Sequence, residues 1–105
     1  DIHKIDWLKI DIEGAELEAL AGAQRTLETY RPKVIIEVAA AHLERAGHSP
    51  QSIFAFWEQL GYHIFEITED GATMRLTNPQ RIAEVDGLNL LCTPAEKPHD
   101  ASVTN

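Results

Sequence analysis

The sequence predicts an α/β fold in which helices cover a parallel sheet. Segments rich in β-branched and aromatic residues alternate with segments whose apolar residues recur at helical spacing. The segment 33–38 is also a nearly continuous apolar run, which is typical of a strand buried on both faces of a parallel sheet. The order strand, helix, strand, helix favours right-handed crossovers with helices on the faces of the sheet.

Three elements are expected in the first part of the chain. A strand over 5–12 ends at Glu13-Gly14, where the hydrophobic period changes. A helix over 15–28 follows, and Arg31-Pro32 stops it because the residue before a proline avoids the right-handed α region. Apolar residues recur every three or four positions along this helix: Leu17, Leu20, Ala23 and Leu27. The strand over 33–38 comes next.

The second part begins with a short helix over 39–46 and a longer one that starts at Ser49-Pro50, with serine as the cap and proline at the first helical position. The longer helix carries one apolar stripe, formed by Ile53, Phe56, Trp57 and Leu60, and ends at Gly61. The remaining elements are a strand over 62–68, a hairpin turn at 69–71, a strand over 72–76, a loop over 78–87 and a strand over 88–92.

Composition excludes several classes of protein. The chain has 105 residues, 44% of them apolar, which suits one domain or part of one. Its net charge of −8 argues against binding to nucleic acid or to anionic membranes, since both need a basic patch. No apolar run approaches the length of a membrane span. The single cysteine, Cys92, fits a reducing compartment, and we expect a cytoplasmic protein.

The chain reads as a piece of a larger sheet. It opens on Asp1 rather than methionine, and its first strand is too apolar for a comfortable sheet edge. We therefore expect a fragment whose first strand could pair with another chain. The tail over 94–105 has little to bury and is expected to be disordered.

Acidic side chains stand where the first two strands end. Asp11 and Glu13 close the first strand, and Glu37 interrupts the second, where an unpaired buried carboxylate is costly. Lys9 shares a strand face with Asp11, the nearest partner for its charge. In open parallel sheets ligands bind beyond the carboxyl ends of the strands, so these residues form a candidate site.

Three chemistries fit such a group of residues. One carboxylate could act as a general base on a substrate hydroxyl, with Glu37 or Asp11 as the base. Two carboxylates could instead hold Mg²⁺ through oxygen ligands. The structural alternative is that Asp11 and Glu13 cap the helix while Lys9 pairs with an acid.

The local pattern resembles the FkbM family of S-adenosylmethionine-dependent methyltransferases. The resemblance rests on Lys9-Ile10-Asp11-Ile12-Glu13-Gly14-Ala15-Glu16, Leu20-Ala21-Gly22-Ala23, Arg31-Pro32, Ile35-Ile36-Glu37-Val38 and Leu60-Gly61-Tyr62. It implies that residues 1–93 are the C-terminal part of a Rossmann-like class I methyltransferase domain whose last strand runs antiparallel. It further implies methyl transfer to a hydroxyl oxygen of a sugar, other glycan or secondary metabolite, with this chain as the substrate-side half. Lys9, Asp11, Glu13 and Glu37 would then border the methyl-transfer pocket as catalytic residues.

The chain departs from the family pattern on the cofactor side. The family binds S-adenosylmethionine mainly through a glycine-rich turn after its first strand and an acid after its second. Neither is present in these 105 residues. We therefore assign no cofactor-binding residue and expect this chain alone to bind the cofactor poorly and to be inactive.

Other residues carry weaker signals. The five histidines show no metal-ligand spacing with one another or with Cys92, so no metal ligand is assigned. Cys92 is expected to be a buried, inert thiol, and Trp7 and Trp57 are expected to pack in the core. Two functions compete with methyl transfer: a signalling module with Asp11 as phosphoacceptor, and a truncated, non-catalytic remnant that pairs with another protein through its first strand.

Overall fold

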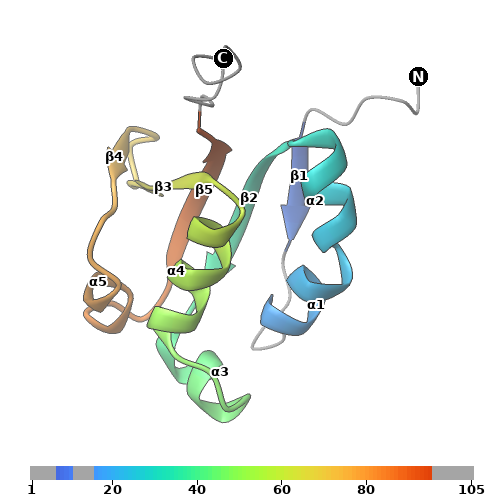
Figure 1. The fold of residues 1–105 in the computed structure, drawn as a ribbon. Coiled ribbons are helices and arrows are strands. Elements are labelled where there is room, and N and C mark those ends of the chain that lie inside the picture. Colours follow the sequence, from blue (N-terminus) through green and yellow to red (C-terminus); the bar gives the residue numbers. More distant parts are fainter. Residues whose placement is uncertain (1–6, 11–15, 96–105) are drawn as a thin grey trace.

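The computed structural model describes residues 7–10 and 16–95. Within these ranges one sheet holds five strands, in the order β1-β2-β5-β3-β4 (Figure 1). The elements are β1 (Trp7–Ile10), α1 (Glu16–Gly22), α2 (Gln24–Tyr30), β2 (Lys33–Val38), α3 (Ala40–Arg45), α4 (Pro50–Gln59), β3 (Tyr62–Ile67), β4 (Thr73–Arg75), α5 (Gln80–Ala83) and β5 (Leu88–Pro94).

The sheet is mixed rather than parallel. β1 and β2 run parallel, with Leu8 opposite Val34. β5 lies between β2 and β3 and is antiparallel to both, with Leu90 opposite Ile36 on one side and Cys92 opposite Ile64 on the other. The prediction of an α/β fold is therefore confirmed, and the last strand has the antiparallel direction that the resemblance implied. Because β5 is antiparallel to both of its neighbours, β3 runs in the same direction as β1 and β2, and β4 adds the antiparallel partner of the predicted hairpin.

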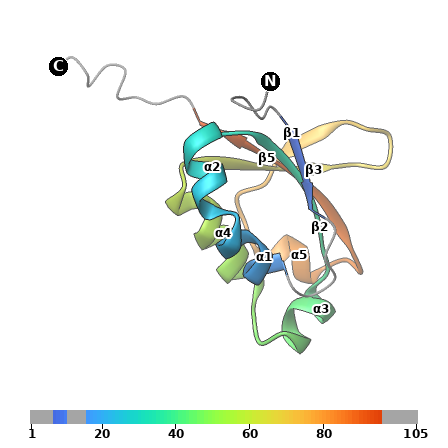
Figure 2. The ribbon, with the colours of Figure 1, turned by 90° about the vertical axis from the view of Figure 1, so that its right-hand side faces the viewer.

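Helices α1, α2 and α4 lie on the same face of the sheet (Figure 2). Alternate residues of each strand point toward them, so the core contains Val34, Ile36 and Val38 from β2 together with Leu27 and Trp57 from the helices. The aromatic part of this core is a cluster in which the Trp57 ring lies 4.9 Å from that of Tyr62, between centroids. The core thus occupies the space between the sheet and one helix layer.

Two burial predictions for the first strands are wrong. β2 was expected to be buried on both faces, yet Lys33 and Glu37 are exposed, because the described helices cover only the opposite face. Lys9 is exposed on the same face. Trp7 was expected in the core but is 55% exposed, and the Lys33 ammonium lies 5.3 Å from the centre of its ring.

The helix expected over 15–28 is divided in two. α1 ends at Gly22 and α2 begins at Gln24, with Ala23 between them at φ −96° and ψ 4°. Glycine is a poor helix former, which explains why the break falls here. Arg31 leaves the right-handed α region as predicted, with φ 51° and ψ 49°.

The later elements follow the sequence more closely. The Ser49 side chain caps α4 by accepting a hydrogen bond from the Ser52 N–H at 3.2 Å. Gly61 and Gly71 have positive φ values of 75° and 88°, as the end of α4 and the hairpin turn require. The four-residue helix α5 is a difference, since the sequence predicted only a loop there.

The end of the chain contributes one further contact. β5 reaches Pro94, and the Ala95 N–H donates to the Gly61 carbonyl oxygen at 2.8 Å. Residues 96–105, which make up most of the predicted tail, lie outside the described residues. Over the described ranges, every helix is too short or too polar to cross a membrane.

Candidate functional site at the carboxyl edge of the sheet

A cleft of about 880 Å³ opens where β3 ends and β5 begins. The carboxyl ends of β2 and β3 lie at the same edge of the sheet, because Asn89 is the register partner of both Glu37 and Ile67, and β1 runs parallel to β2. The cleft is lined by Glu66, Ile67, Thr68, Glu69, Asp70, Arg81, Val85, Gly87, Leu88 and Asn89. Its volume lies within the range of about 300 to 1,000 Å³ that is usual for small-molecule sites.

Glu37 borders this cleft from β2. It is the register partner of Asn89, which lines the cleft. A Cβ atom placed on Gly87 would lie 3.6 Å from Glu37 Oε2, so the carboxylate stands beside the backbone that forms the cleft wall. Glu37 is exposed, because it points away from the helix layer. The cost expected for a buried carboxylate therefore does not arise.

Lys9 lies on the same uncovered face as Glu37. It is the register partner of Ile35, and Glu37 follows Ile35 by two residues on that face. In the described parts of the chain, neither Lys9 nor Glu37 forms an ion pair. Asp11 and Glu13 lie outside the described residues, so the grouping of all four predicted site residues stays a prediction.

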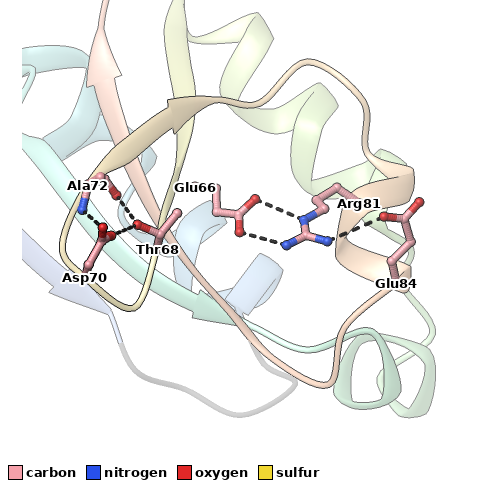
Figure 3. A network of polar contacts seen from close by, with 6 residues as sticks. All are labelled: Glu66, Thr68, Asp70, Ala72, Arg81 and Glu84. Atoms are coloured by element: carbon pink, nitrogen blue, oxygen red, sulfur yellow. Dashed lines mark hydrogen bonds and ion pairs between the residues drawn. The ribbon is translucent and has the colours of Figure 1, made fainter.

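A two-pronged ion pair forms one wall of the cleft. Arg81 of α5 donates from Nε to Glu66 Oε1 at 3.0 Å and from Nη2 to Glu66 Oε2 at 2.9 Å (Figure 3). Its Nη1 lies 3.6 Å from Glu84 Oε1. The hydrogen bond from Arg81 holds the pKa of Glu66 below its usual range, and the same bond raises the pKa of Arg81. This pair fastens α5 to β3.

The hairpin turn between β3 and β4 forms another part of the wall. The Thr68 hydroxyl donates to Asp70 Oδ1, and the Ala72 N–H donates to the same oxygen at 3.2 Å (Figure 3). These two bonds, Thr68 first, lower the pKa of Asp70. The carboxylate is therefore held in place and stays charged near neutral pH.

A second, smaller cleft lies at the opposite edge of the sheet. It has a volume of about 370 Å³ and includes Glu58, His63 and Arg75 in its lining. Arg75 Nη2 lies 2.6 Å from His63 Nδ1. Arginine stays protonated, so His63 Nδ1 accepts this hydrogen bond. Glu37 lies beside Gly87, which lines the larger cleft, and the larger cleft is therefore the candidate site.

The described part of the chain contains no cluster of potential metal-ligating side chains. Over residues 7–10 and 16–95, no group of three or more histidine, cysteine, aspartate or glutamate side chains is arranged to hold a metal ion. Cys92 is fully buried as predicted, and burial raises the pKa of its thiol. A Mg²⁺ site that includes Asp11 or Glu13 would involve residues outside the described ranges.

Sequence reasoning did not find most of the cleft. Arg81 was placed in a loop, and its partner Glu66 lies 15 residues earlier in the chain. No spacing rule links two such positions. The turn at 69–71 was predicted as a hairpin, but its place in a cleft wall depends on where α5 packs.

A family model described as the methyltransferase FkbM domain matches residues 1–64, which is more than half of the chain. The match contains Lys9, Asp11, Glu13 and Glu37 and ends within β3. The residues that line the larger cleft all follow it. Searches among curated proteins and among solved structures give no match.

Proposed function

This chain belongs to the FkbM methyltransferase domain family, and we propose that it forms the acceptor side of an S-adenosylmethionine-dependent O-methyltransferase. The acceptor would present a hydroxyl group, as sugars and secondary metabolites do. The observation that carries the proposal is the position of Glu37: an exposed carboxylate at the carboxyl end of β2, beside a cleft of about 880 Å³. An open α/β sheet binds ligands at this edge.

In this proposal Glu37 is the general base. Its carboxylate would accept the proton of the acceptor hydroxyl, whose oxygen would take the methyl group from the sulfur of S-adenosylmethionine and leave S-adenosylhomocysteine. The cleft holds the acceptor so that the hydroxyl faces Glu37, which contributes to catalysis by positioning. Asp11 is the alternative base and Glu13 a further carboxylate of the site, with Lys9 adjusting the charge around them.

We assign no cofactor-binding residue among the described residues. S-Adenosylmethionine supplies the methyl group when it is bound. The glycines of the described residues stand singly in separate turns or at helix ends, as at Gly47, Gly61 and Gly71, and make no glycine-rich loop. We propose that the cofactor is held by residues outside the described ranges. The Mg²⁺ alternative, with Asp11 and Glu13 as ligands, stays open in the same proposal.

The test uses the longest polypeptide that the gene encodes, with release of S-adenosylhomocysteine as the readout over a panel of hydroxylated sugars and metabolites. Glu37→Gln removes the base and keeps the shape, so turnover should fall by about 100-fold or more. The matched control is Glu28→Gln, an exposed glutamate of α2 in the helix layer. Asp11→Asn is measured beside it.

The outcomes separate the roles. A large loss in Glu37→Gln, with Glu28→Gln unchanged, supports Glu37 as the base. Turnover within about threefold of wild type in Glu37→Gln contradicts that role. A loss of less than tenfold in Asp11→Asn makes Asp11 structural. Addition of EDTA tests the metal alternative, because a Mg²⁺-dependent reaction would stop.

One observation favours a second candidate function, the protein-pairing module. Within the described residues β1 has a partner strand on one side only, and it ends the strand order of the sheet. An edge strand presents unpaired backbone groups that another chain can pair with. Sizing by light scattering at micromolar concentration tests this candidate. Dimers or larger species support it, and a monodisperse monomer contradicts it.

A further inference from the structure

The charge of the larger cleft is dominated by carboxylates. Among the described residues that line it, Arg81 is the one lysine or arginine, and Glu66, Glu69 and Asp70 are acids. Whether the cleft can bind an anionic ligand depends on whether Arg81 is free to pair with it, since a guanidinium is the usual protein partner of phosphates and carboxylates.

The guanidinium of Arg81 is already occupied. Its Nε and Nη2 each donate to one oxygen of Glu66, and Nη1 faces Glu84. All three nitrogen atoms thus meet carboxylates of the chain itself (Figure 3). Glu66 is well shielded, with a side chain only 12% exposed, so solvent screens this pair less than a fully exposed one. The guanidinium of Arg81, which could otherwise bind an anionic ligand, is therefore already paired with carboxylates of the chain.

The remaining carboxylates of the lining have no such neutralising cation. Glu69 is exposed, and Asp70 is exposed and held by Thr68 and Ala72 through hydrogen bonds from neutral groups. An anionic group that enters the cleft would meet these charges without a guanidinium to compensate. A cationic amine would meet them favourably.

We propose that Arg81 is a specificity-determining residue of the cleft, because its guanidinium is paired with Glu66. The cleft accepts hydroxylated acceptors that carry an amine or are neutral, and it rejects phosphorylated ones. This inference rests on the proposed function, which makes the cleft the binding site of the methyl acceptor. It goes further because it specifies the charge of that acceptor. All of the residues that carry it lie beyond the part that matches the family model.

The experiment compares three probes that share one ring: glucosamine, glucose and a glucose phosphate. Binding to the full polypeptide is followed at low salt by NMR, through the backbone amide shifts of Thr68, Gly87 and Asn89 in the cleft. Wild type should bind glucosamine at least about fivefold more tightly than the glucose phosphate, as expected for one or two partly screened charge contacts. Added salt should narrow this ratio.

The decisive variant is Glu66→Gln, which removes the carboxylate that pairs with the guanidinium of Arg81. Glutamine keeps the size of the side chain but loses its charge, so Arg81 becomes available and the glucose phosphate should bind about fivefold more tightly than to wild type. The double variant Glu66→Gln with Arg81→Gln should lose that gain. Glu28→Gln, on the helix layer, should leave all three affinities unchanged.

The outcomes decide the proposal. If wild type binds the phosphate as tightly as the amine, the proposal is overturned, and the same holds if the double variant keeps the gain of Glu66→Gln. Circular dichroism confirms that each variant is folded. The methyltransferase assay is read separately: methyl transfer to a phosphorylated acceptor overturns this inference and leaves the proposed function standing. Binding of the amine without any methyl transfer supports this inference and overturns the proposed function.

Discussion

Arg31 and Gly61, thirty residues apart, are joined by a hydrogen bond from the guanidinium Nη2 to the Gly61 carbonyl oxygen at 3.1 Å. The Nη1 of Arg31 also donates to the Leu60 carbonyl oxygen. The guanidinium carbon lies 4.8 Å from the centre of the Tyr62 ring. Arg31 thus ends α2 through its left-handed backbone and caps the carboxyl end of α4 through its side chain.

The first prediction concerns Gly61. Gly61→Ala should destabilise the fold by about 1–2 kcal/mol, because φ is +75° and the new Cβ would lie 3.3 Å from Arg31 Nη2. Urea denaturation measures the loss. Gly47→Ala is the matched control, since φ is +84° there but the Cβ would meet nothing within 4 Å. A Gly61→Ala loss no larger than that of Gly47→Ala would contradict the role of the Arg31 contact.

The second prediction concerns alkaline pH. The buried Tyr62 hydroxyl donates to the Pro32 carbonyl oxygen at 2.6 Å, and burial raises the pKa of Tyr62 from 10.0 to about 12. The unfolded chain therefore loses this proton before the folded chain does. The contribution of Tyr62 is fully present below pH 10 and is lost as pH rises from about 10 to 12.

Urea midpoints measured between pH 8 and 12 test this dependence, and the decline should begin near the ordinary tyrosine pKa of 10.0. The buried thiol of Cys92, whose pKa is also raised, adds a decline that begins at lower pH. Tyr62→Phe should have a lower midpoint at pH 8 and a shallower decline above pH 10. An unchanged slope in Tyr62→Phe would show that other groups cause the alkaline loss.

The third prediction concerns the two tryptophans. Trp7 is 55% exposed, whereas Trp57 is fully buried. Acrylamide should quench the wild-type fluorescence in two classes. In Trp7→Phe, a substitution at the surface, the accessible class should disappear and the remaining emission should lie at shorter wavelength. Strong quenching that persists in Trp7→Phe would contradict the burial of Trp57.

The fourth prediction concerns the hairpin turn in the cleft wall. Asp70→Ala removes the acceptor for Thr68 and Ala72, so the turn amides should exchange with deuterium faster than in wild type. The Gly71 amide, which donates to the Thr68 carbonyl oxygen at 2.9 Å, is the reporter. Glu69→Ala is the control at the neighbouring exposed position.

The pH dependence of that turn has the opposite sign to that of Tyr62. The pKa of Asp70 is lowered in the folded state, so its support is present above the ordinary value of 3.8 and is lost as pH falls through the lowered value. Exchange at Gly71 in wild type, corrected for the intrinsic rate, should therefore approach that of Asp70→Ala in acid. A constant ratio between the two proteins at all pH values would contradict this link.

Local chemistry was sufficient for most of the elements. Ser49-Pro50 marks the start of α4, Gly61 its end, and Gly71 the hairpin turn, because capping and positive φ depend on a few adjacent residues. The same holds for the general position of Glu37 at a strand end. The motif around Glu37 also lies within the residues that the family model matches.

Burial could not be predicted in the same way. The sequence of β2 is a nearly continuous apolar run that Glu37 interrupts, so the strand was expected to be buried on both faces, yet a helix layer over one face leaves Lys33 and Glu37 exposed. Trp7 was misplaced for the same reason. A strand pattern shows which residues share a face, but not which faces another layer covers.

The sequence by itself determined the α/β order of elements, the turns and caps, and the place of Glu37 at a strand end, because these depend on neighbouring residues. Only the tertiary structure decided that β5 enters between β2 and β3, and that Glu66 pairs with the guanidinium of Arg81. Those relationships join positions far apart in the chain. Their energies come from packing and charge in three dimensions, which no local pattern contains.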